Sequence, residues 1–179
     1  MPIELKTHRL ESSSDITLFS LEPEEKVLRD KVLMEEYGYE DKKGRLGLSN
    51  EINTEAFNTQ GLKLNINRHD GEIVMIDESE RRLWAWKISE IEFKLRNLCL
   101  IFVRTLRNNG VLEFKIESAE LMVGLNPECF FNLIERGEIV INLRMHLKET
   151  GVARNHGTAF RTNNWDLLRS CYEDSYRLI

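Results

Sequence analysis

The amino-acid sequence predicts an α/β fold in which a mixed central sheet is flanked by helices. Segments with strand periodicity and segments with helix periodicity follow one another along 179 residues, and no repeat, linker or low-complexity tract divides them. A content of 41% hydrophobic and 31% charged residues is typical of a globular protein with a sizeable core. We therefore expect a single domain over residues 1–179.

The first third of the chain predicts two strands and a helix. Residues 3–9 and 16–19 have strand patterns on either side of a serine-rich turn. Residues 23–38 predict a helix, because Pro23 suits a first turn, two glutamates follow it and Gly38 suits the C-terminal cap.

The middle of the chain predicts two hairpins. Asp70-Gly71 and Asn109-Gly110 are favoured hairpin turns, and each lies between apolar segments. Residues 83–95 fit either a helix or a strand, since short apolar runs do not distinguish the two. The cysteine at position 99, within a run of apolar residues, is expected to be buried and inert.

The last third predicts a short helix at residues 126–137, with Asn126 as its N-cap and Gly137 closing it. A strand follows at residues 138–147, with apolar residues at alternate positions. Residues 148–164 predict a polar, glycine-bearing loop, and residues 165–178 predict a closing amphipathic helix.

Charge and cysteine usage narrow the function classes. The net charge of −5 argues against a protein that binds nucleic acid over its whole surface, but residues 136–161 hold five Lys or Arg against two Glu, a local charge of +3. Three widely spaced cysteines and no secretory signal predict reduced thiols in the cytoplasm. No apolar run is long enough to span a membrane.

Glu4 and Lys6 are the candidate catalytic pair. Residues two apart on a strand share a face, so a carboxylate and an ammonium group would lie together. Mg²⁺-dependent cleavage of a phosphodiester uses a carboxylate to hold the ion and a lysine to orient or deprotonate the attacking water. The spacing also recurs at residues 92–94 and 113–115, so it fits a solvated strand face as well.

Polar residues of the late strand and loop are the candidate DNA contacts. Arginine reads guanine through two hydrogen bonds, and arginine and asparagine also bind phosphates. The alternative is a solvated sheet face with a surface loop. The candidates are Asn142, Arg144, His146, Arg154, His156 and Arg161.

Two stretches together resemble a known family. "PIELKTHRLESSSDITLF" is similar to the catalytic strand of the MvaI/BcnI family of type II restriction endonucleases, and more distantly to the repair nicking enzyme MutH. "GEIVINLRMH" and "RNHGTAFR" resemble the family's DNA-reading region. The resemblance implies a PD-(D/E)xK core with a catalytic strand in residues 1–20 and a DNA-reading region at about 138–165.

The same resemblance implies an activity and roles for residues. Family members cut double-stranded DNA with Mg²⁺ at short GC-rich sites such as CCWGG or CCSGG, and they act as monomers. Glu4 would match the metal-binding carboxylate and Lys6 the lysine of the motif. Arg144 would match a base-reading arginine, preceded here by Asn142 where the family often has Asp. His156 and Arg161 would match residues that contact the groove.

The sequence departs from the family before Glu4. The family places a metal-binding Asp a few residues upstream, and no Asp stands in that position here. We therefore expect that the N-terminal segment is missing through a miscalled start or truncation, or is supplied by another chain, and that this chain cuts DNA weakly or not at all. A truncated chain should be less stable than its parent or should associate through exposed sheet surface. The alternatives are a catalytically dead DNA-binding remnant, a MutH-like nicking endonuclease, and a protein with no nucleic-acid role, which the net charge favours.

Overall fold

The strands of the protein form three sheets. The computed structural model describes residues 3–9, 16–40, 46–49, 62–107, 114–147, 153–162 and 164–179. Sheet A holds, in order, β1 (Glu4–Arg9), β9 (Leu98–Arg107), β10 (Phe114–Leu125) and β13 (Tyr172–Arg177). Sheet B holds β2 (Ile16–Ser20), β12 (Ala153–Thr162), β11 (Ile139–Leu147), β5 (Leu46–Ser49) and β4 (Tyr39–Glu40). Sheet C holds β3 (Glu25–Lys26), β8 (Arg82–Lys87), β7 (Glu72–Ile76) and β6 (Lys63–Asn67).

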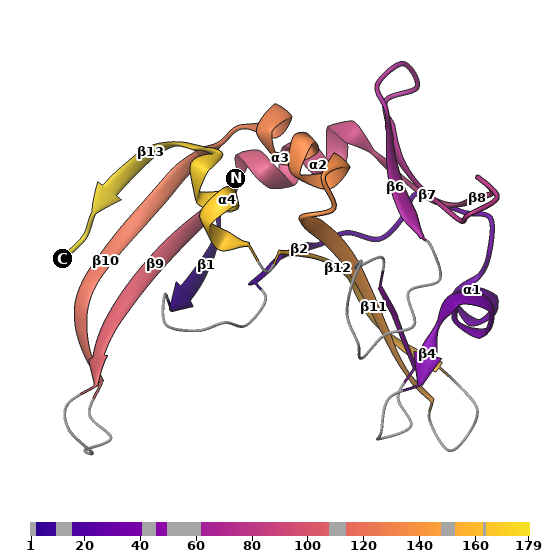
Figure 1. Ribbon diagram of the computed structural model, residues 1–179, viewed down its shortest axis with the longest axis horizontal. Coiled ribbons are helices and arrows are strands. Elements are labelled where there is room, and N and C mark those ends of the chain that lie inside the picture. The colour runs from indigo at the N-terminus through magenta and orange to yellow at the C-terminus, as the bar shows by residue number, and fades with distance from the viewer. Residues whose placement is uncertain are drawn as a thin grey trace.

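Four helices accompany these sheets in the described residues. They are α1 (Asp30–Tyr37), α2 (Ile88–Arg96), α3 (Pro127–Glu135) and α4 (Trp165–Ser170). Figure 1 shows α2 and α3 between sheet A on the left and sheets B and C on the right. The mixed α/β class is thus confirmed. The two strands expected at the N-terminus are also confirmed, but β1 belongs to sheet A and β2 to sheet B.

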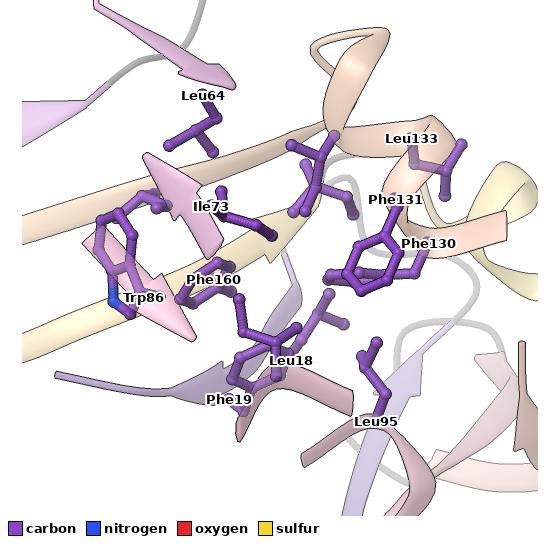
Figure 2. Packing of buried hydrophobic residues seen from close by; sticks show 14 of the residues in the cluster. Leu18, Phe19, Leu64, Ile73, Trp86, Leu95, Phe130, Phe131, Leu133 and Phe160 are labelled. Carbon is purple, nitrogen blue, oxygen red and sulfur yellow. The ribbon is translucent and has the colours of Figure 1, made fainter. Parts of the chain in front are cut away.

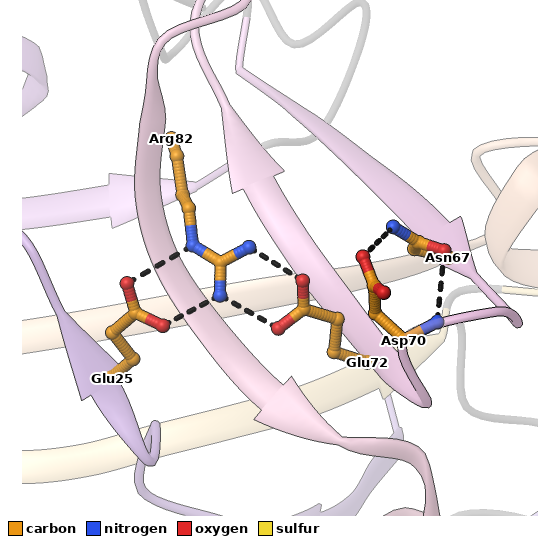
Figure 3. A network of polar contacts seen from close by, with 5 residues as sticks. All are labelled: Glu25, Asn67, Asp70, Glu72 and Arg82. Carbon is orange, nitrogen blue, oxygen red and sulfur yellow. Dashed lines mark hydrogen bonds and ion pairs between the residues drawn. The ribbon is translucent and has the colours of Figure 1, made fainter.

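Both hairpins form where their turn residues predict them. β6 and β7 pair in antiparallel register, and Gly71 takes the positive φ of 66° that the turn requires. The side chain of Asn67 closes this turn, as Figure 3 shows: its Nδ2 donates a hydrogen bond of 2.7 Å to Oδ2 of Asp70, and its Oδ1 accepts one of 3.2 Å from the backbone N–H of Asp70. β9 and β10 form the second hairpin, whose tip at residues 108–113 lies outside the described residues. The segment 83–95, which fitted either a strand or a helix, contains one of each: strand β8 and then helix α2.

The helix α3 forms as expected, because its ends are capped locally. The side chain of Asn126 accepts a hydrogen bond of 3.1 Å from the backbone N–H of Cys129, and Pro127 opens the helix. Gly137 has φ of 75° just after the helix ends. The apolar side of α3 is buried, with Phe130 and Phe131 both at most 1% exposed.

One main core joins sheets B and C, α3 and the buried residues of sheet A. Phe160 stacks on Phe19 with ring centroids 4.7 Å apart, and Trp86 meets Phe160 edge to face at 5.7 Å (Figure 2). Trp84 and Trp86 are fully buried, and each indole N–H donates a hydrogen bond of 2.9 Å to a backbone carbonyl. Burying an indole without leaving its N–H unpaired is what makes these two positions favourable in the core.

The helix expected over residues 23–38 begins only at Asp30. Residues before it are extended because they pair with β8: the N–H of Glu24 donates to the carbonyl of Ala85, at 2.9 Å. Figure 3 shows the Arg82 guanidinium bridging the carboxylates of Glu25 on β3 and Glu72 on β7. Cross-strand hydrogen bonds and this double ion pair outweigh the local helix pattern.

Two further predictions for the C-terminal third are wrong. The expected loop at 148–164 contains strand β12, which pairs with β11 and β2, and the expected helix at 165–178 ends at Ser170. Residues after it turn into β13, which adds an edge to sheet A beside β10. Long-range pairing decides both segments, and neither pairing leaves a clear local pattern in the sequence.

The cysteines also differ from expectation. Cys129 on α3 and Cys171, directly after α4, form a disulfide that closes 42 residues, whereas both were expected to be reduced. Cys99 carries a free thiol and is partly exposed instead of buried. Among the described residues, we find no helix with the length and apolar character of a membrane span.

Candidate active site

The strand that carries Glu4 and Lys6 lies at the edge of sheet A. β1 runs parallel to β9, 94 residues further along the chain, and places Glu4 opposite Leu98 and Lys6 opposite Leu100. Lys6 is partly buried, and Leu5 between the pair is 53% exposed. Positions 4 and 6 thus fall on one face by register, while the side chain of Glu4 lies outside the described residues.

His8 is a further polar residue on the same strand face. It lies opposite Phe102 in the parallel register and is 7% exposed. Its ring is 6.0 Å from Phe102 and 5.9 Å from Trp165, and burial lowers the pKa of the imidazole. Within the described part of the chain, Nε2 of His8 has no hydrogen-bond partner. The sequence signal for His8 is its spacing of four residues from Glu4 along an alternating strand.

Helix α4 covers this face of sheet A. The Asn164 side chain caps the helix by accepting a hydrogen bond of 3.2 Å from the N–H of Leu167. Trp165 packs 5.7 Å from Phe102, and the Arg169 guanidinium lies 5.5 Å from the same ring while it pairs with Glu120 of β10. The strand with Lys6 and His8 is therefore held between β9 and α4.

The described side chains do not complete a metal site. No group of three or more His, Cys, Asp or Glu able to hold a metal ion occurs in the described residues. A Mg²⁺ ion needs several oxygen ligands in near-octahedral geometry. The described side chains alone do not fit such an ion, and we derive no reaction step through it.

The other two Glu-x-Lys sequences differ in their setting. Residues 92–94 lie on α2, where positions two apart do not share a face, so they cannot form the strand arrangement. Lys115 lies on β10, and Glu113 lies outside the described residues. Within the described residues, the sequence at residues 4–6 lies on a strand over its whole length.

The candidate DNA contacts lie on the two central strands of sheet B. β11 pairs with β12, with Asn142 opposite Ala159 and His146 opposite Arg154, and β11 also pairs with β5, with Arg144 opposite Gly47. The apolar face of these strands carries Phe160 toward Trp86 of sheet C. The opposite face of β11 and β12 is named here the polar face. By register it includes positions 142, 144, 146, 154 and 161.

His156 sits at an irregularity of β12. The three-residue step from Asn155 to Thr158 opposes the two-residue step from Leu143 to Met145, so β12 bulges at His156 and Gly157. Thr158 beyond the bulge is fully buried, and Arg161 is partly buried. The side chains of residues 142–147 and 153–157 lie outside the described residues.

The chain is similar to known proteins in sequence and in fold. The model of the MvaI/BcnI restriction endonuclease family matches residues 1–169. Two solved structures match 99% of this chain and 78% of their own at 22% identity: a complex of the restriction endonuclease MvaI with its cognate DNA substrate, with a TM-score of 0.67, and MvaI without DNA, with 0.63. At this identity the likeness shows a common fold. No curated protein sequence matches the chain.

Proposed function

The chain belongs to the MvaI/BcnI restriction endonuclease family, and we propose on this basis that it acts on double-stranded DNA as a Mg²⁺-dependent endonuclease with a short GC-rich target. In this proposal residues 1–179 are one endonuclease-like domain that works in the cytoplasm. The observation that carries it is the placement of Glu4 and Lys6 on one edge strand, together with a polar face on the neighbouring sheet.

The proposed chemistry assigns separate tasks to the two sheets. Glu4 would supply a carboxylate to the metal ion, and Lys6 would orient or deprotonate the attacking water. His8 would fix the position of the strand, since it is wedged between Phe102 and Trp165.

DNA contact would come from the polar face of sheet B. This face is turned away from sheet C, because the opposite face carries Phe160 against Trp86 of β8. DNA contacting both sheets would meet β1 and the polar face together. The residues proposed to contact it are Asn142, Arg144, His146, Arg154, His156 and Arg161.

Plasmid cleavage tests the nuclease proposal. We expect residues 1–179 to nick supercoiled plasmid slowly or not at all in Mg²⁺, because Glu4 is the one carboxylate in the sequence of residues 3–9 and Mg²⁺ needs several oxygen ligands. Any Mg²⁺-dependent nicking should vanish in Lys6→Ala and persist in Lys94→Ala, which removes the lysine of the copy on α2. Equal nicking by both variants would contradict the role of Lys6, and robust cutting by the unmodified chain would contradict the expectation of weak activity.

A DNA-binding protein without cleavage is the second candidate. The single carboxylate in the sequence of residues 3–9 favours it. It predicts duplex binding that weakens with salt and does not require Mg²⁺. Binding together with nicking in Mg²⁺ would exclude this candidate, whereas binding with no nicking at any enzyme concentration would favour it over the nuclease.

A further inference from the structure

The hairpin of β9 and β10 extends beyond both of its neighbours in sheet A. β1 pairs with β9 as far as Val103, and β13 pairs with β10 as far as Glu120. Past these positions, at residues 104–107 and 114–118, the two strands pair only with each other in the described part of the chain. We name these two ranges the arm, and Figure 1 shows it at lower left, beyond the end of β1. A two-stranded ribbon buries little surface of its own, so the arm has both of its faces available for contact.

The arm is positively charged in a chain that is negative as a whole. It holds three Lys or Arg, which are Arg104, Arg107 and Lys115, against one Glu, which is Glu117, so its local charge is +2 while the whole chain has −5. Lys115 lies opposite Leu106 in the register, and therefore on the same face as Arg104. Clustered Lys and Arg are what the phosphates of a nucleic-acid backbone attract.

Arg104 is an exposed arginine on the same face of sheet A as Lys6 and His8. His8 lies opposite Phe102, and Arg104 follows Phe102 by two residues, which on a strand places the side chains on one face. Within the described residues, the guanidinium of Arg104 makes no hydrogen bond or ion pair, whereas that of Arg82 is held between two carboxylates. The Arg104 side chain is therefore available to an anionic ligand.

We propose that the arm is a second DNA-contact surface, in which the guanidinium of Arg104 binds a phosphate of the duplex backbone. This contact rests on the function proposed above, because its ligand is double-stranded DNA. A guanidinium matches a phosphate with two parallel N–H donors. Arg104 follows Leu100, the partner of Lys6, by four residues, which is about 13 Å along a strand. A duplex rises about 3.4 Å per base pair, so one held at Lys6 presents further phosphates within this distance.

The arm and the polar face of sheet B have different tasks in this arrangement. Every base pair carries the same phosphates, so a phosphate contact adds affinity and fixes the position of the duplex without reading its sequence. Arg144 on the polar face is proposed to read a base. Arg104 therefore contributes equally to binding of any duplex, and its contribution weakens as salt rises.

Fluorescence anisotropy of labelled duplexes without Mg²⁺ tests the role of Arg104. Removing one phosphate contact lowers the slope of log K against log salt concentration by about 0.9. Arg104→Ala should bind more weakly than the unmodified protein at about 50 mM salt, and this deficit should narrow about 3.5-fold by about 200 mM. The deficit should be the same for a GC-rich and an AT-rich duplex. Arg104→Lys, which keeps the cation, should retain most of the slope.

Arg81→Ala is the matched control, because it makes the same change in net charge at a distant position. Arg81 lies between β7 and β8 of sheet C, its side chain is about half exposed, and it pairs with Glu36 at 3.6 Å. This variant should keep the salt slope of the unmodified protein. An equal change of slope in Arg81→Ala and Arg104→Ala would reduce the effect to net charge and would overturn the proposal.

The remaining outcomes separate the arm contact from the proposed function. Duplex binding with an unchanged salt slope in Arg104→Ala would overturn the arm contact and leave the proposed function standing. A deficit confined to the GC-rich duplex would also overturn it, since Arg104 would then read bases. Failure of the unmodified protein to bind any duplex at low salt would overturn both.

Discussion

Opening the bond between Cys129 and Cys171 should destabilise the protein strongly. The bond closes a loop of 42 residues and so restricts the conformations of the unfolded chain. This lower entropy of the unfolded chain stabilises the folded state by about 4 kcal/mol. For a chain of this size, 1 kcal/mol corresponds to a shift in Tm of about 2–4 °C, so we expect a decrease of roughly 8–16 °C. The bond joins α3 to the end of α4, the helix whose Trp165 packs on His8 of the candidate catalytic strand.

Differential scanning calorimetry with and without dithiothreitol measures this effect on the unmodified chain. Cys171→Ser should give a similar loss without reductant and should no longer respond to it. Cys99→Ser is the matched control, since Cys99 is free and should leave the response to reductant unchanged. A Tm that reductant does not change would refute the reasoning. In a reducing compartment this contribution would be absent, and the protein would depend on its core alone.

Three other perturbations have definite expected outcomes. Phe160→Ala should lower the free energy of unfolding by about 3–5 kcal/mol in urea denaturation, because Phe160 is fully buried against Phe19; a loss below about 1 kcal/mol would contradict its place in the core. Asn126→Ala should cost about 1 kcal/mol in the same assay through loss of the α3 cap, and Asn126→Asp should restore it. The Arg82 guanidinium lowers the pKa of the Glu72 carboxyl group. The pair therefore stabilises the folded protein fully at a pH above the ordinary carboxyl pKa, and this stabilisation is lost as the pH falls through the lowered pKa. Glu72→Gln should accordingly flatten the acid limb of Tm against pH, and an unchanged acid limb would contradict the pairing.

Much of the fold follows from local signals in the sequence. Turn residues fix the hairpin around Gly71, and Asn126 with Pro127 and Gly137 fixes α3. The segments that differ from expectation are those decided by distant partners. β3 forms on β8, and β13 forms on β10, and in both cases a pairing across the chain overrides a helix pattern.

The candidate site divides in the same way. The strand position of Glu4 and Lys6 follows from alternation, but the parallel pairing of that strand with β9 could not be predicted, since no local feature links segments so far apart. His8 was missed because its burial depends on Trp165 from α4. The placement of His156 at a bulge of β12, instead of in a loop, likewise depends on pairing with β11.

Binding of a short GC-rich duplex tests the central proposal, that this family member acts on DNA through the polar face of sheet B. Fluorescence anisotropy without Mg²⁺ at several salt concentrations should show binding that weakens as salt rises. Arg144→Ala should weaken it by about fivefold or more, a loss of about 1–3 kcal/mol for a base-reading arginine. Arg96→Ala, which removes an arginine of α2 that pairs with Glu92, should have little effect. No binding at low salt, or equal losses in the two variants, would contradict the proposal.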